Sequence, residues 1–158
     1  TFQDTFFIQT RGRGFEPLTD RVAAIVAKSR VRVGLCNVFT QHTSASLLIT
    51  ENADPAVRRD LERFMQRVAP DGSPDYEHDT EGPDDMPAHI RSVLTAATLS
   101  IPIAGGALQL GTWQGIYLWE HRRAPHRREI LVTVVGDLEG DLLACVSRCT
   151  IRGLSSGG

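Results

Sequence analysis

Strand-like segments follow one another through the second half of the chain with no helix between them, and this grouping constrains the fold most. The segments are rich in apolar residues, and turn residues such as Gly105 and Gly106 separate them. A doubly wound parallel sheet would instead alternate strands strictly with helices. The order therefore favours an α+β fold. The predicted strands of this half are residues 101–103, 107–110, 115–120, 129–135 and 141–151.

The first half of the chain mixes strands with helices. Residues 1–10, 32–40 and 44–51 are predicted strands, and apolar residues at helical spacing predict a helix over residues 19–29. Asp54 before Pro55 predicts a second helix start, because an oxygen-bearing cap residue before proline is typical there. Asp85 before Met86 and Pro87 predicts a third. Apolar stripes on these two helices are expected to face the core: Val57, Leu61, Phe64, Met65 and Val68, then Ile90, Val93, Leu94 and Ala97.

Size and charge narrow the class of protein. The 158 residues suit one domain, predicted over residues 1–154, with residues 155–158 as a flexible tail. A formal net charge of -2 argues against nucleic acid as a partner, and the basic run from Arg122 to Arg128 is interpreted as a solvated loop. No apolar stretch approaches the roughly 20 residues that span a bilayer, and the N-terminus lacks a secretory pattern. Three cysteines cannot all pair, which favours a reducing, cytoplasmic location.

Three of the five histidines lie where predicted elements meet. His42 lies in the corner between two strands, His78 in a loop rich in Pro, Gly and Asp, and His89 in the first turn of the third helix. Neutral imidazole is a common zinc ligand, and a helix N-terminus disfavours the charged form of His89. Spacing alone does not make a metal site, and single histidines are more often surface residues or hydrogen-bonded in the core. The residues by themselves leave both interpretations open.

Acidic and aromatic residues surround these histidines in the sequence. The acids near His78 form either a solvated loop with a helix cap at Asp85 or a set that orients the histidines. In the segment 111–122, period two places Glu120 on the face of Ile116 and Leu118. A carboxylate buried there needs a partner, for which Arg122 or a histidine is available. The acids are Glu77, Asp79, Glu81, Asp84 and Asp85.

Three long blocks resemble the signature segments of one known family. QHTSASLLITENADP (41–55), HDTEGPDDMPAHI (78–90) and GTWQGIYLWEHR (111–122) are similar to those of the YjbQ-like proteins, also called secondary thiamine-phosphate synthases, in the same order. The similarity extends from about residue 5 to 136. It implies an α+β fold with a two-sheet β-sandwich and three helices, assembled as a homotrimer in the cytoplasm.

The resemblance also implies roles for individual residues. His42, His78 and His89 match shared histidines and are the expected ligands of Zn²⁺, with another divalent ion such as Mg²⁺ as the alternative. The expected catalytic residues are Glu120, Arg122 and Glu81. The expected substrate-binding residues are Ser44, Asn52, Trp113 and Gln114.

Several functions fit this set of residues. The resemblance implies a synthase that joins an aminopyrimidine diphosphate to a thiazole phosphate, with arginine and metal stabilising the departing diphosphate. Histidine ligands suit zinc better than Mg²⁺, so a zinc-dependent hydrolase of another small phosphorylated substrate is an alternative. A non-catalytic trimer that binds metal or a small anion is a third. None of these calls for nucleic acid or a membrane as a partner.

Overall fold

The computed structural model describes residues 1–138, which form two antiparallel sheets and three helices. This confirms the predicted α+β sandwich. The strand predicted over residues 141–151 and the boundary at residue 154 lie outside the described residues. The strands are β1 (Phe2–Gln9), β2 (Gly14–Pro17), β3 (Val31–Thr40), β4 (Ala45–Glu51), β5 (Thr98–Ala104), β6 (Ala107–Leu108), β7 (Gln114–Glu120) and β8 (Arg127–Leu138), and the helices are α1 (Thr19–Ser29), α2 (Pro55–Val68) and α3 (Asp85–Leu94).

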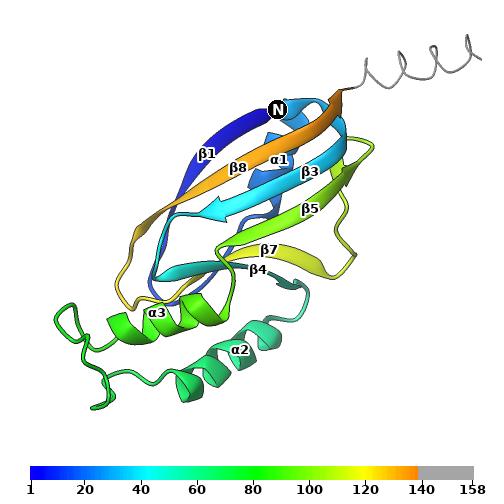
Figure 1. The fold of residues 1–158 in the computed structure, drawn as a ribbon. Helices are drawn as coiled ribbons and strands as arrows, with labels where there is room; N and C mark the ends of the chain where they lie inside the picture. Colours follow the sequence, from blue (N-terminus) through cyan, green and yellow to red (C-terminus); the bar gives the residue numbers. More distant parts are fainter. Residues whose placement is uncertain (139–158) are drawn as a thin grey trace, which may run out of the picture.

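The two sheets differ in size and in what covers them. The larger sheet has the strand order β1-β8-β3-β5-β6, and the smaller has β2-β7-β4. Figure 1 shows α2 and α3 at the end of the molecule where β7 and β4 lie, away from the larger sheet. In the pairing of β1 with β8, Phe2 lies opposite Val134 and Gln9 opposite Arg127. The chain start and the end of β8 therefore lie together at one end of the sandwich.

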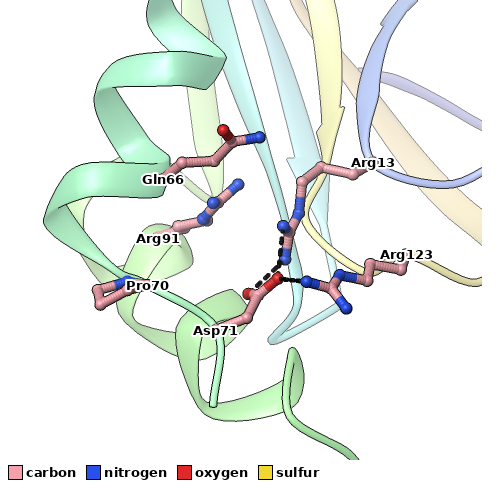
Figure 2. A pocket seen from close by; sticks show the side chains of 6 residues that line it. All are labelled: Arg13, Gln66, Pro70, Asp71, Arg91 and Arg123. Atoms are coloured by element: carbon pink, nitrogen blue, oxygen red, sulfur yellow. Dashed lines mark hydrogen bonds and ion pairs between the residues drawn. The ribbon is translucent and has the colours of Figure 1, made fainter. Parts of the chain in front are cut away.

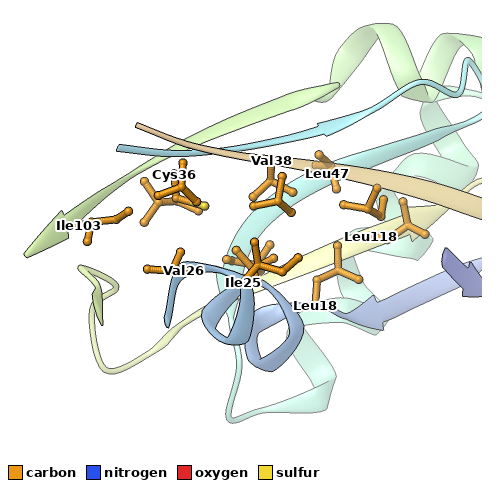
Figure 3. Packing of buried hydrophobic residues seen from close by; sticks show 14 of the residues in the cluster. Leu18, Ile25, Val26, Cys36, Val38, Leu47, Ile103 and Leu118 are labelled. Atoms are coloured by element: carbon orange, nitrogen blue, oxygen red, sulfur yellow. The ribbon is translucent and has the colours of Figure 1, made fainter. Parts of the chain in front are cut away.

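The hydrophobic core fills the space between the larger sheet and a layer made of α1 and the smaller sheet (Figure 3). Alternate residues of β8, such as Val132 and Val134, are fully buried, as expected for a strand with one covered face. Helix α1 contributes Val22 and Val26 to the same cluster. On β7, Ile116, Leu118 and Glu120 are fully buried, and Tyr117 and Trp119 between them are buried too, so both faces of this strand are covered.

Local signals explain where the helices begin. The Asp54 carboxylate accepts a hydrogen bond from the Ala56 N–H, and Pro55 is the first residue of α2, as predicted. The short strand β2 lies between the predicted strand over residues 1–10 and the predicted helix over residues 19–29, where no element is predicted. Gly14 in fact pairs with Glu120 of β7. None of the helices in residues 1–138 is long and apolar enough to cross a membrane.

The apolar stripes predicted to face the core are largely exposed within one chain. On α2 only Met65 is buried, while Phe64 is exposed, and on α3 Val93 is 83% exposed. Helix α3 instead buries Ala88 and Arg91. The prediction is wrong because periodicity shows only that a helix is amphipathic, and on α3 the residue that is buried is Arg91, which forms an ion pair with Glu62 of α2.

Candidate metal centre

Helix α3 supplies two side chains to a cluster of potential metal ligands. Asp85 is the first residue of α3 and His89 follows four residues later, so both project from one face of the helix. The Asp85 Oδ2 atom lies 3.4 Å from the His89 Nε2 atom. The third member, His78, comes from the preceding loop, and its Nε2 atom donates a hydrogen bond of 2.7 Å to the same Oδ2 atom, because a carboxylate only accepts. One ligand atom from each side chain lies within 4.8 Å of the others.

The hydrogen bond on the other side of the His89 ring fixes its tautomer. The Nδ1 atom lies 3.0 Å from the backbone oxygen of Thr43, which only accepts, so Nδ1 carries the proton and donates it. In the neutral ring, Nε2 then has a free lone pair, and this lone pair faces the Asp85 carboxylate. A cation bound here would be coordinated by both His89 Nε2 and Asp85 Oδ2, two atoms that otherwise repel each other. In metal sites, the histidine ring nitrogen that does not bind the metal usually donates a hydrogen bond to a carbonyl or carboxylate oxygen.

Arg122 holds the second oxygen of the Asp85 carboxylate. The Arg122 Nη1 atom donates to Asp85 Oδ1, its Nε atom donates to Asp84 at 3.1 Å, and its Nη2 atom donates to the Glu81 backbone oxygen at 2.8 Å. All three nitrogens are therefore engaged. In this arrangement Arg122 acts as a positioning residue for Asp85. Glu81 contributes its carbonyl, and its side chain is exposed.

Within residues 1–138, His42 is not a member of this cluster of potential ligands. Its Nε2 atom accepts a hydrogen bond of 2.9 Å from the Glu129 N–H at the start of β8. Burial lowers the pKa of His42, and the nearby Arg128 charge lowers it further. A neutral ring that accepts at Nε2 carries its proton on Nδ1. His42 thus presents a hydrogen-bond donor, whereas a ligand needs a free lone pair.

Glu120 is fully buried and forms an ion pair with Arg128. The Arg128 Nε atom donates to Glu120 Oε2 at 2.7 Å, the Thr10 hydroxyl donates to the same oxygen, and the Arg122 N–H donates to Oε1. Burial raises the pKa of Glu120, but these donors outweigh it and bring the pKa below its ordinary value. A carboxylate so firmly ionised and enclosed is a poor general base.

The four expected substrate-binding residues divide between two ends of the smaller sheet. Ser44 lies near Glu120, where its hydroxyl and its backbone oxygen both accept from Arg128. Asn52, Trp113 and Gln114 lie at the other end, where Glu51 of β4 pairs with Gln114. The seven residues of β4 separate the two ends by about 20 Å. One chain does not bring these three residues to the histidine cluster.

The sequence did not assign the roles that two residues take. For Asp85 it left open a helix cap or a role in orienting the histidines, and the spacing of four from His89 was the signal that both share one helix face. Arg128 was assigned to a solvated loop, yet its side chain is 5% exposed. No sequence signal identifies its partner, because Glu120 and Arg128 face each other only once the strands have paired.

Comparison with known proteins shows to which family the chain belongs. The family model described as UPF0047 protein YjbQ-like matches residues 4–137. The chain belongs to this family. UPF0047 protein sll1880 of Synechocystis is 51% identical over 136 residues, which cover 86% of this chain and 92% of that protein. UPF0047 protein YjbQ of Escherichia coli O157:H7 is 46% identical over 137 residues, which cover 86% of this chain and 99% of that protein.

Solved structures agree with this assignment. A YjbQ/UPF0047 family protein from Clostridium acetobutylicum is 37% identical, with a TM-score of 0.78 over 84% of this chain and 99% of that one. Hypothetical protein APE1520 from Aeropyrum pernix is 26% identical, with a TM-score of 0.80 over 87% of this chain and 100% of that one. The names of these UPF0047 relatives state no activity. Membership of the UPF0047 family therefore defines the fold, and the reaction has to be argued from the site.

Proposed function

We propose that this UPF0047 protein is a metal-dependent enzyme that acts on a small phosphorylated substrate. The observation that carries the proposal is that the Nε2 atoms of His78 and His89 lie 2.7 and 3.4 Å from the same Asp85 carboxylate oxygen. Two imidazoles and one carboxylate suit Zn²⁺ and leave a coordination position for a substrate. The His78 and His89 side chains are 44% and 32% exposed, so the cluster is open to solvent.

The surroundings of the cluster leave room for a small substrate. A pocket of about 370 Å³ lies against His78, with Tyr76 and Asp79 among its other lining residues. A divalent ion at the cluster would supply the positive charge that stabilises a phosphate oxygen. Arg122 keeps Asp85 in place, and His42 offers a proton on Nδ1 from the neighbouring corner. An ion held by His78, Asp85 and His89 would orient the substrate.

Within this class we put forward the secondary thiamine-phosphate synthase activity that the family resemblance implies. The enzyme would join an aminopyrimidine diphosphate to a thiazole phosphate and release diphosphate. A zinc-dependent hydrolase of another small phosphate compound is the second candidate. The ligand set favours it, because two nitrogen ligands and one carboxylate with an open position are typical of zinc hydrolases.

Turnover measurements distinguish these candidates. Metal-stripped and zinc-loaded protein would be supplied with the two synthase substrates, and separately with a phosphate monoester. We expect zinc-dependent turnover of one of them, which an Asp85→Asn variant lowers by about 100-fold and an Asp75→Asn variant leaves unchanged. Asp75 is a suitable control because it is an exposed carboxylate of the same loop region. Absence of zinc-dependent turnover in both assays would leave a non-catalytic binding protein and refute the proposal.

We also propose that the chain assembles as a homotrimer through the open face of the larger sheet. Leu35 of β3 and Val135 of β8 pair directly on this face and are 46% and 41% exposed, beside Val33. An apolar sheet face of this kind is normally covered. Light scattering on a sizing column should give three times the chain mass of 17.4 kDa. A Leu35→Asp variant should elute as a monomer, and a wild-type mass of one chain would disprove the assembly.

A further inference from the structure

A second polar pocket lies at the junction of α2, α3 and two loops, away from the metal ligands. It has a volume of about 410 Å³, and its lining includes neither His78, Asp85 nor His89. Figure 2 shows three arginines approaching the pocket from separate segments of the chain. Arg13 comes from the loop before β2, Arg91 from α3 and Arg123 from the loop after β7. The lining residues are Arg13, Gln66, Pro70, Asp71, Arg91 and Arg123.

Arg91 is a buried cation whose hydrogen bonding is incomplete. Its side chain is fully buried, and its Nη1 atom donates to Glu62 at 2.7 Å. Its Nε and Nη2 atoms have no partner. These two atoms form one edge of the planar guanidinium, the edge that offers two parallel N–H groups to an oxyanion. A buried polar group without a partner carries a free-energy cost, and an absent ion is one explanation for it.

In the part of the chain that the structure describes, most of the buried side-chain atoms that lack a hydrogen-bond partner belong to Arg91 or to a residue linked to it by contacts. Four buried side-chain atoms lack a hydrogen-bond partner in residues 1–138, and two of them belong to Arg91 and one to His121. The His121 ring lies 5.2 Å from that of Trp119, and the Trp119 Nε1 atom shares Glu62 with Arg91. Two of the four atoms therefore belong to Arg91, and the His121 atom belongs to a ring that is linked to Arg91 through Trp119 and Glu62.

The charges of the pocket favour an anion. Arg13 donates two hydrogen bonds, of 2.9 and 3.0 Å, to the Asp71 carboxylate, and Arg123 pairs with the same carboxylate. Three arginines thus face two carboxylates, Asp71 and Glu62, which leaves one positive charge in excess. Asp71 occupies the position that an external oxyanion would take between Arg13 and Arg123. The Arg123 side chain is 61% exposed, so one arm of the pocket is accessible to a ligand.

From these contacts we propose that the pocket is a binding site for a phosphate group, held by the free edge of Arg91 together with Arg13 and Arg123. The phosphate competes with the Asp71 carboxylate for Arg13 and Arg123. Arginine forks match the geometry of phosphate oxygens better than lysine does. The residues of this site are distinct from the proposed metal ligands, and the proposal does not rest on the proposed enzymatic activity.

Calorimetric titration of metal-free, full-length protein with inorganic phosphate tests the site. We expect saturable binding with a Kd of about 0.1–1 mM. An Arg123→Gln variant should bind about 10-fold more weakly, because it loses a charged donor. An Asp71→Asn variant should bind several-fold more tightly, because it removes the competing carboxylate. The matched controls are Arg59→Gln on the exposed side of α2 and Asp75→Asn, which should both leave the Kd unchanged.

The two variants are expected to change the phosphate Kd in opposite directions: Arg123→Gln raises it and Asp71→Asn lowers it. This difference distinguishes a ligand site from a structural ion pair. A purely structural role for Arg13, Asp71 and Arg123 would weaken folding in both variants and strengthen phosphate binding in neither. A Gln66→Glu variant provides a test that leaves every ion pair intact, since Gln66 is exposed at the pocket and a new negative charge there should abolish binding. No saturable binding up to about 10 mM phosphate, or equal Kd values for Gln66→Glu and wild type, would overturn the proposal.

Discussion

Replacing Glu120 with glutamine is expected to lower the free energy of unfolding by about 3–5 kcal/mol, because Arg128 then stays buried without its counter-charge. The two side chains are 0% and 5% exposed, so water cannot compensate for the loss. Urea unfolding followed by circular dichroism measures the change. The double variant Glu120→Gln with Arg128→Met should recover part of the lost stability, because it removes the unpaired charge as well.

The same ion pair predicts a dependence on pH. The pKa of Glu120 in the folded protein lies below the ordinary value of 4.5. The contribution of its charge is therefore complete above that value and is lost as the pH falls through the lowered pKa. Wild-type stability should decrease on this acid side, and Glu120→Gln should lack that part of the decrease. If Glu120→Gln kept full stability and lost only turnover, Glu120 would instead be a catalytic carboxylate.

Replacing His89 with glutamine is expected to weaken zinc binding by more than about 100-fold, since it removes the one nitrogen whose lone pair already faces Asp85. Replacing His42 with glutamine should leave zinc affinity within about 3-fold of wild type, because the His42 Nε2 atom is occupied by the Glu129 N–H. Competition with a chromophoric chelator measures both affinities. His126→Gln serves as the control, because its Nδ1 atom bonds to the Ala124 oxygen outside the cluster.

The comparison of the two histidine variants decides between two ligand sets. The family resemblance implies His42, His78 and His89, whereas the geometry within one chain favours His78, Asp85 and His89. Equal losses for His42→Gln and His89→Gln would support the three-histidine set and would require His42 to turn its ring. A loss confined to His89→Gln would support the set with Asp85.

Local sequence patterns predicted most of the elements, because the forces that set them act over a few residues. The helix over residues 19–29 matches α1, and the Asp54–Pro55 signal matches the start of α2. The faces of α2 and α3 were predicted wrongly because periodicity states that a helix is amphipathic and cannot state what covers it. Val93 is exposed while Arg91 is buried, since a contact with Glu62, 29 positions away, outweighs the local pattern.

The site was predictable to the extent that residue type alone suggests chemistry. His78 and His89 attract attention as imidazoles at the ends of elements, and the structure brings them to a ring separation of 5.4 Å. The partner of Glu120 and the inward turn of Arg91 depend on contacts between segments far apart in the sequence. Such contacts arise from strand register and helix packing, which composition and spacing do not encode.

The strand register has a practical consequence for handling this protein. Phe2 lies opposite Val134, and Gln9 lies opposite Arg127 beside the His42–Glu129 hydrogen bond. The first residue is thus separated from that corner by the length of β1, about 25 Å. A biosensor chip coupled at the Phe2 end of β1 would present the proposed zinc and phosphate sites outward to the flowing analyte.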